Sequence, residues 1–149
     1  MIKLNRTNSE NKDFQYLVLE LDKDLANRNG ETNDFFAQFN KIDRIKYVVI
    51  AMHDNLPVGC GAMKVYDKST MEIKRMFVPT EMRGKGVAVE VLNELESWAR
   101  ELGYEKCVLE TGDKMLEAIG LYKKCGYKII SNYGQYANIE NSICFEKEL

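Results

Sequence analysis

The sequence predicts one α/β domain built around a mixed β-sheet, with a β-α-β unit at its centre. The 149 residues are enough for one sizeable core, and 45% hydrophobic with 30% charged residues is typical of a globular protein. Segments rich in β-branched residues alternate with segments of helical periodicity. Between residues 71 and 102, a strand-like run, a glycine-containing loop and a strongly periodic helix follow one another directly. We therefore expect a single domain over residues 1–149.

The first half of the chain predicts one strand, two helices and a three-stranded antiparallel meander. Apolar residues recur at helical spacing between residues 14 and 25, and Asn29-Gly30 ends that helix. Tight turns are expected at residues 54–55 and 68–69, where polar residues separate β-rich runs. The predicted elements are, in order, a strand at residues 2–4, a helix at 10–27, a short helix capped by 33–34, and strands at 46–52, 58–66 and 71–78.

The second half contains the most strongly predicted element, the helix that follows the glycine loop. Its apolar residues fall on one face, and Gly103 ends it. These residues are Ala88, Val91, Leu92, Leu95, Trp98, Ala99 and Leu102. The later predicted elements are a buried strand at residues 106–110, a helix at 115–122 that ends near Gly126, and strands at 127–130 and 142–146. The expected order is therefore β-α-α-β-β-β-α-β-α-β-β.

The charge balance and hydropathy of the chain exclude several classes of partner. The net charge of −2 provides no general attraction to nucleic acid or to an anionic membrane. No apolar run approaches the roughly 20 residues that span a bilayer. The first 14 residues lack the apolar stretch of a signal peptide. We therefore expect a cytoplasmic protein without nucleic-acid or membrane partners.

The cysteine pattern argues against a metal site. The only histidine is His53, and no two of the four cysteines stand at metal-ligand spacing. Each cysteine lies in an apolar context, which predicts buried, reduced thiols. A catalytic cysteine would need His53 beside it, and nothing in the sequence places it there. The four cysteines are Cys60, Cys107, Cys125 and Cys144.

The loop from Arg83 to Ala88 is a candidate site for an anionic ligand. Its glycines let a ligand approach the backbone closely, and the first amides of the following helix have no internal partner. A P-loop would need Ser or Thr after Gly84-Lys85, and a dinucleotide-binding loop would need a third glycine at residue 89, which is valine. The pattern that fits is Arg-x-x-Gly-x-Ala, with Arg83 and Lys85 adding positive charge. The alternative is a glycine-rich turn that binds no ligand.

Three blocks of the sequence, in this order and spacing, carry a resemblance to a known family. The blocks are the strand ending at residues 72–78, the loop at 83–88 and the segment at 118–127. The chain resembles the GNAT superfamily of acyl-CoA N-acyltransferases over nearly its whole length. The resemblance implies a mixed, mostly antiparallel sheet of six to seven strands flanked by about four helices, within one N-acetyltransferase domain.

The resemblance also implies a co-substrate, acetyl-CoA, and no metal. Its pantetheine arm would pair with the strand at Met76, Phe77 and Val78 like an extra strand, and the Val78 N–H would polarise the thioester carbonyl. Its pyrophosphate would lie on the amides of the loop. The loop residues implied in binding are Arg83, Gly84, Lys85, Gly86, Val87 and Ala88.

Glu72 and Tyr122 are the candidate catalytic residues that the resemblance implies. An amine at neutral pH is mostly ammonium, so a carboxylate such as Glu72 is needed to accept its proton. Tyr122, with an ordinary pKa near 10, would hydrogen-bond the CoA sulfur and protonate the leaving thiolate. The alternatives are a surface glutamate paired with Lys74 or Arg75, and a tyrosine that only packs against the sheet. Family members often carry Asn where this chain has Met115, which removes one polar contact to CoA.

These residues predict an N-acetyltransferase that moves an acetyl group to a primary amine by direct attack in a ternary complex. Tyr133 and Tyr136 either line the acceptor pocket or cover the edge of the core. Asp24, Arg28 and Glu31 either face the same pocket or are solvated. The acceptor would be a small-molecule amine or a peptide amine, and a homodimer is compatible with the resemblance. The rival functions are a CoA-binding regulatory module and a domain that binds another nucleotide.

Overall fold

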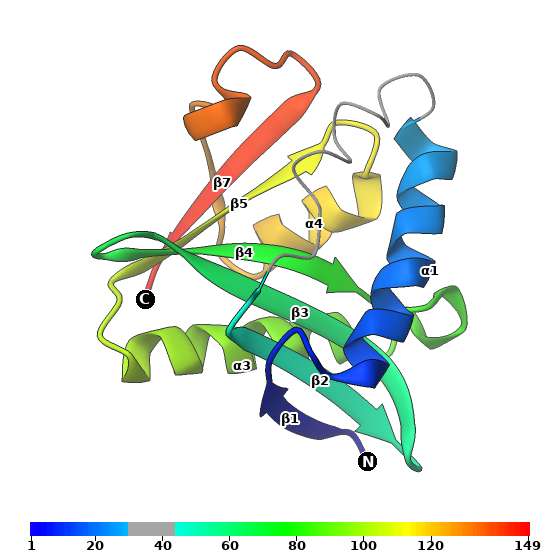
Figure 1. Ribbon diagram of the computed structural model, residues 1–149. Helices are drawn as coiled ribbons and strands as arrows, with labels where there is room; N and C mark the ends of the chain where they lie inside the picture. Colours follow the sequence, from blue (N-terminus) through cyan, green and yellow to red (C-terminus); the bar gives the residue numbers. More distant parts are fainter. Residues whose placement is uncertain (30–43) are drawn as a thin grey trace.

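The structure is a computed structural model that describes residues 1–29 and 44–149. Its seven strands form one sheet in the order β1-β2-β3-β4-β5-β7-β6 (Figure 1). The strands are β1 (Lys3–Thr7), β2 (Tyr47–His53), β3 (Leu56–Asp67), β4 (Thr70–Phe77), β5 (Lys106–Gly112), β6 (Lys128–Ile130) and β7 (Ser142–Glu148). The described residues also form α1 (Lys12–Asn29), α3 (Val87–Glu101), α4 (Leu116–Lys124) and the 3₁₀ helices η2 (Thr80–Met82) and η3 (Gly134–Tyr136).

The predicted mixed sheet is confirmed, because among the strands of the described residues only β4 and β5 pair in parallel and the other neighbours are antiparallel. Three α-helices lie in the described residues, against about four expected. The short helix predicted after residues 33–34 falls outside the described residues. The β2–β3 turn is made by Asp54 and Asn55 with φ of 50° and 65°, the left-handed geometry that a two-residue hairpin needs.

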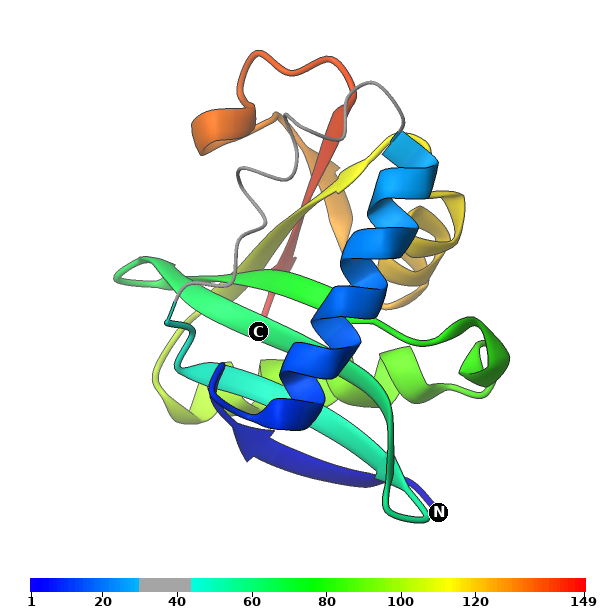
Figure 2. The ribbon, with the colours of Figure 1, turned by 45° about the vertical axis from the view of Figure 1, so that its right-hand side comes forward.

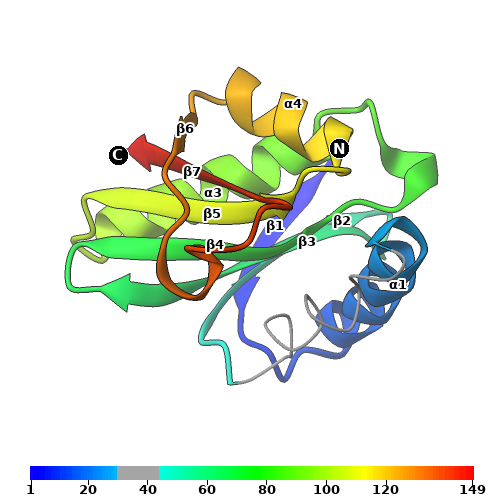
Figure 3. The same cartoon turned by 90° about the horizontal axis from the view of Figure 1, so that it is seen from above.

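Helices cover both faces of the sheet. Figure 3 shows α1 on one side and α3 with α4 on the other. Alternate residues of β2 explain this arrangement, since Val48 and Ile50 pack with α1 while Val49 and Ala51 pack with α3. The run of apolar residues in β2 is therefore continuous rather than alternating, as expected for a strand that is covered on both faces.

The feature that creates the site is the divergence of β4 from β5. The two strands pair only from Thr70 to Glu72 and then separate, as Figures 1 and 2 show. A β-bulge contributes to this, since Arg75 and Met76 together lie opposite the single residue Gly61 of β3. Within the part of the chain that the structure describes, the edge of β4 that faces β5 therefore has no strand partner beyond Glu72, and its backbone groups are available to another extended chain.

Burial explains the state of the cysteines. Cys60, Cys107 and Cys144 are buried and Cys125 is partly buried, all with free thiols. Burial raises the pKa of Cys60 and of Cys107 to about 12, so these thiols are inert at neutral pH. His53 contacts Met1 and Asp54. Within residues 1–29 and 44–149, no cluster of three or more His, Cys, Asp or Glu is placed to hold a metal ion. No helix in these ranges has the length and apolarity to cross a bilayer.

Candidate active site

A cavity of about 430 Å³ opens between the end of β4, the glycine loop and α4. Most of the residues predicted to bind the cofactor line it. They are Met76, Phe77 and Val78 from the end of β4, Arg83, Gly84, Gly86, Val87 and Ala88 from the loop and the start of α3, and Tyr122 from α4. Lys85 is exposed on the loop and does not line the cavity.

The glycine loop presents its backbone to this cavity. Gly84 and Gly86 adopt φ of 79° and 81°, and a Cβ atom at either position would meet nothing within 4 Å. The first hydrogen bond of α3 runs from the Glu90 amide to the Gly86 carbonyl, at 3.1 Å. The amides from Val87 to residue 89 precede that bond and have no intrahelical acceptor. An open loop surface and unpaired amides at a helix N-terminus together favour a phosphate ligand.

The side chain of Arg83 ties together the elements around the cavity. Its Nε donates to the Val78 carbonyl at 2.8 Å. The guanidinium lies 3.5 Å from a carboxylate oxygen of Asp24 in α1 and 3.8 Å from one of Glu117 in α4. It also stands 5.9 Å from the ring centre of Phe77. These contacts hold the end of β4 against α1 and α4. Arg83 is also the first residue of the glycine loop.

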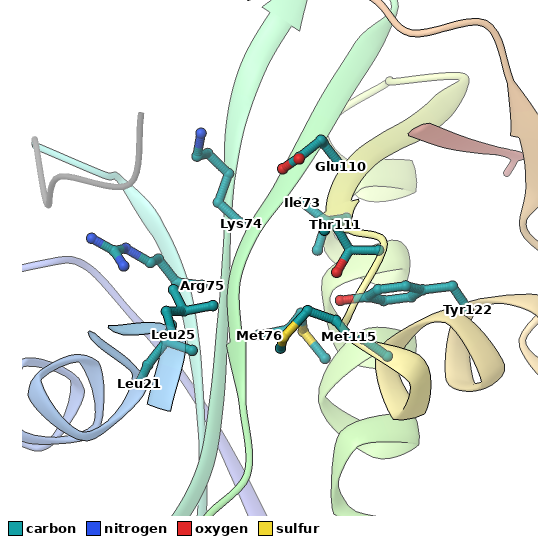
Figure 4. Close-up of a pocket in the computed structure, with 12 residues that line it drawn as sticks. Leu21, Leu25, Ile73, Lys74, Arg75, Met76, Glu110, Thr111, Met115 and Tyr122 are labelled. Atoms are coloured by element: carbon teal, nitrogen blue, oxygen red, sulfur yellow. The ribbon is translucent and has the colours of Figure 1, made fainter. Parts of the chain in front are cut away.

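A smaller cavity of about 100 Å³ adjoins the first. Leu21, Met76, Met115, Ala118 and Tyr122 line both cavities. Figure 4 shows the smaller cavity, with Lys74, Arg75 and Met76 from β4 on one side and Glu110, Thr111 and Tyr122 from β5 and α4 on the other. Asp24, one of the charged residues predicted near the acceptor, lines the larger cavity. The side chain of Arg28 and all of Glu31 lie outside the described residues.

Glu110 is the carboxylate that lines the smaller cavity, and sequence reasoning did not select it. Burial raises its pKa to about 7, although a hydrogen bond from Ser142 and the charge of Lys74 act in the opposite direction. The Ser142 hydroxyl donates to Glu110 Oε2 at 2.8 Å. A carboxyl group with a pKa near neutrality is well matched to accept a proton from an amine. The signal in the sequence was a glutamate directly after the apolar residues 107–109.

Glu72 lies on the same face of the sheet as Glu110 but does not line either cavity. It is paired in register with Val108, two residues before Glu110, and side chains two residues apart share a face. The Tyr133 hydroxyl donates to Glu72 Oε2 at 2.7 Å. The Lys74 ammonium lies 3.9 Å from Glu72 Oε1. Glu72 is therefore a nearly buried carboxylate held in place by its neighbours.

The two predicted acceptor-pocket tyrosines belong to the environment of Glu72. Tyr133 and Tyr136 pack edge to face with ring centres 5.7 Å apart, and Tyr136 is buried. Neither of them lines the two cavities. Burial and the adjacent Glu72 carboxylate raise the pKa of Tyr133 far above its ordinary value, so its hydroxyl stays protonated as a donor. Their role in acceptor binding stays a prediction.

Tyr122 combines a packed ring with a hydroxyl that faces the cavities. Its ring lies 5.8 Å from that of Tyr127 and 5.9 Å from that of Phe145, centre to centre. Its hydroxyl points toward Met76 and Met115, in the gap between β4 and α4 (Figure 4). Burial raises the pKa of Tyr122 above its ordinary value, which keeps the phenol protonated at any working pH. The residue is therefore suited to donate a hydrogen bond, whereas its raised pKa opposes full transfer of its proton.

Comparison with known proteins places this geometry in a family. The model of the acetyltransferase (GNAT) family matches residues 8–127. IAA acetyltransferase of Azospirillum brasilense is 30% identical over 136 residues, which cover 89% of this chain and 88% of that protein. A Klebsiella pneumoniae protein assigned to the acyl-CoA N-acyltransferases has a TM-score of 0.82 at 23% identity, covering 100% of this chain and 98% of that one. The PaiA N-acetyltransferase of Thermoplasma acidophilum, solved with coenzyme A, has a TM-score of 0.76 at 16% identity, covering 100% and 99%.

Two of these matches decide the family, and the two solved structures support the fold. The family model covers most of the chain, from before α1 to the residue before β6. The Azospirillum relative matches over nearly the full length of both chains. The chain therefore belongs to the acetyltransferase (GNAT) family and is an acetyl-CoA-dependent N-acetyltransferase.

Proposed function

We propose that the protein transfers the acetyl group of acetyl-CoA to a primary amine by direct attack within a ternary complex. The observation that carries this proposal is the pair of adjoining cavities, which share Tyr122 and differ in chemistry. The larger one has the size and the helix N-terminus for a cofactor with a diphosphate. The smaller one holds a carboxylate of matched pKa. Because the proposed donor and acceptor sites meet at Tyr122, the acetyl group can pass directly from one substrate to the other. A covalent intermediate on Cys60 or Cys107 is disfavoured, since burial keeps these thiols protonated.

Acetyl-CoA would enter with its diphosphate at the loop and its thioester at the end of β4. The amides from Val87 to residue 89 have no intrahelical acceptor and would accept the diphosphate oxygens. The edge of β4 beyond Glu72 has no strand partner and would pair with the pantetheine amides. The Val78 N–H would stabilise the oxyanion that forms on the thioester carbonyl. Holding both reactants in one cleft supplies the effect of high local concentration.

Proton transfer in this scheme uses groups on both sides of the cleft. The attacking amine must lose a proton, and Glu110 is the carboxylate that lines the acceptor cavity. Glu72, the base that the resemblance implies, is nearby and contributes to raising the pKa of Glu110. The leaving CoA thiolate would accept a hydrogen bond from the Tyr122 hydroxyl, which stays protonated. The proton that leaves the amine thus reaches a carboxylate, and a hydrogen bond from α4 stabilises the thiolate until it leaves as CoA.

An acetylation assay over a panel of amines tests the proposed function directly. Purified protein is mixed with acetyl-CoA and each amine, and released CoA thiol is measured alongside the mass of the acetylated product. We expect amine-dependent thiol release with one acetylated product per thiol. Tight acetyl-CoA binding without transfer to any amine would instead indicate a regulatory module. Stabilisation by ATP or NAD but not by acetyl-CoA in a thermal-shift assay would refute the CoA site.

Replacing Tyr122 by phenylalanine is expected to lower kcat by about 10- to 100-fold with little change in the Kd for acetyl-CoA. The ring contacts with Tyr127 and Phe145 remain, so only the hydroxyl is lost. Steady-state kinetics and calorimetric titration with acetyl-CoA separate the two quantities. The matched control is Tyr104→Phe, which removes the hydroxyl of a partly buried tyrosine that lines neither cavity. An unchanged kcat in Tyr122→Phe would remove the phenol from the mechanism.

A further inference from the structure

We propose that the acceptor carries a carboxylate in addition to its amine, and that Arg75 binds this carboxylate at the far side of the smaller cavity. This inference rests on the proposed acetyl transfer and names the class of acceptor, an amino acid or a related amino carboxylate. It depends on the backbone strain, burial and hydrogen bonding of Arg75, on the distribution of charge across the cavity and on the size of the cavity.

Arg75 combines three features that are unfavourable in a free enzyme. Its backbone has a φ of 59°, in the left-handed region that a residue with a Cβ atom seldom adopts. Its side chain is only 3% exposed although it is charged. Its Nε is buried and has no hydrogen-bond partner among the residues that the structure describes. A buried donor without an acceptor and a strained backbone both destabilise the fold, and such features gather at functional sites.

The pairing of Arg75 leaves the Nε edge of its guanidinium without a partner among the described residues. Its NH1 group donates to Asp22 Oδ1 at 2.8 Å, and Asp22 is 51% exposed on α1. That contact occupies one end of a planar group that has five N–H donors. The Nε edge is the part that lacks a partner. A carboxylate oxygen is the acceptor that a guanidinium N–H binds most strongly, so a ligand carboxylate would satisfy this edge.

The charges across the cavity match the two ends of an amino carboxylate. Lys74 and Arg75 extend on the β4 side next to α1, and Glu110 and Tyr122 lie on the side of β5 and α4 (Figure 4). Lys74 adds a second cation to that side, with Glu72 as its partner at 3.9 Å. An acceptor with its carboxylate toward Arg75 would place its amine toward Glu110 and the thioester. A polyamine would instead bring a second ammonium against the two cations.

The size of the cavity favours a small acceptor. Its volume is about 100 Å³. Pockets for drug-sized ligands measure about 300–1,000 Å³, several times larger. The cavity therefore accommodates a group of a few heavy atoms, such as the ammonium and carboxylate of one amino acid. A large polycyclic amine would have to remain mostly outside it.

The test compares each amino acid with its own carboxamide as acceptor for the wild-type enzyme. The carboxamide has the less basic amine, which favours its reaction, so a preference for the acid must arise from recognition. We expect kcat/KM for the best amino acid to exceed that for its carboxamide by at least 10-fold. In Arg75→Gln, kcat/KM for the acid should fall at least 10-fold while that for the carboxamide stays within about twofold. The control Lys68→Gln removes an exposed cation in the β3–β4 turn and should change neither.

The outcomes separate this inference from the proposed function. Equal use of amino acids, carboxamides and polyamines by the wild-type enzyme would overturn the carboxylate site while acetyl transfer stands. Failure of every amine to release CoA thiol would overturn both. The comparison of acid with carboxamide uses the wild-type enzyme, so it remains decisive if Arg75→Gln does not fold. An Arg75→Gln enzyme that keeps the preference for the acid would also contradict the assignment to Arg75.

Discussion

Replacing Glu110 by glutamine is expected to lower kcat by about 10²- to 10³-fold, which is the usual contribution of a positioned general base. The substitution keeps the shape of the side chain, and the amide oxygen can still accept the hydrogen bond from Ser142. What it removes is the group that takes the proton from the attacking amine. Acetyl-CoA binding should not change, because Glu110 does not line the larger cavity. Single-turnover kinetics with saturating acetyl-CoA measures the chemical step without product release.

The pH dependence of the same variant gives an independent readout. In the wild-type enzyme the base is active when deprotonated, so kcat should rise with pH through about 7 and then level off. Glu110→Gln should lose this inflection. Glu72→Gln removes a negative charge that raises the pKa of Glu110, so it should move the inflection to lower pH. If Glu72→Gln rather than Glu110→Gln abolishes the inflection, the base is Glu72.

Glu110→Gln should also stabilise the protein above neutral pH. The folded carboxyl has a pKa of about 7 against an ordinary value of 4.5, so between these values the folded state binds more protons than the unfolded state. The free energy of unfolding therefore falls as the pH rises from about 4.5 to about 7, by on the order of 3 kcal/mol in total. Glutamine does not titrate, so the variant does not lose this free energy of unfolding as the pH rises. Urea unfolding should show the variant more stable than the wild type at pH 8, with a much smaller difference at pH 5.

The fold was predictable because its signals are local. The helix after the glycine loop was predicted from the spacing of its apolar residues and forms as Val87–Glu101. The meander was predicted from short polar turns, and Asp54-Asn55 adopts the left-handed geometry that such a turn requires. The loop itself was recognisable because the need for positive φ restricts residues 84 and 86 to glycine.

The acceptor side of the site was not predictable because it is assembled from distant segments. Glu110 follows the apolar residues 107–109 of β5, and only the pairing of β4 with β5 puts it on the face that carries Glu72. Tyr133 contacts Glu72 across 61 positions of sequence. The strain at Arg75 follows from a bulge opposite Gly61, and sheet register is not visible in a single strand. These properties depend on which strands become neighbours, and local periodicity carries no information about that.

Replacing Gly86 by alanine is expected to weaken acetyl-CoA binding by at least about 10-fold. Gly86 has a φ of 81°, and the space where a Cβ atom would stand is open. In the complex that we propose, the diphosphate occupies this space, and a methyl group would hold it away from the amides at the start of α3. The left-handed backbone also disfavours alanine by about 1–2 kcal/mol, so the variant should be less stable. Calorimetric titration with acetyl-CoA and urea unfolding measure the two effects separately.

Gly103→Ala is the matched control that separates backbone strain from loss of the ligand. Gly103 follows α3 with a φ of 92°, a Cβ atom there would also meet nothing within 4 Å, and it lines neither cavity. The two variants should therefore lose similar stability, because they introduce the same kind of strain at opposite ends of one helix. Only Gly86→Ala should lose affinity for acetyl-CoA. Equal affinities in the two variants would mean that the diphosphate does not bind at the glycine loop. The position of the thioester next to Tyr122 would then have no support, and the proposed placement of both substrates would be wrong.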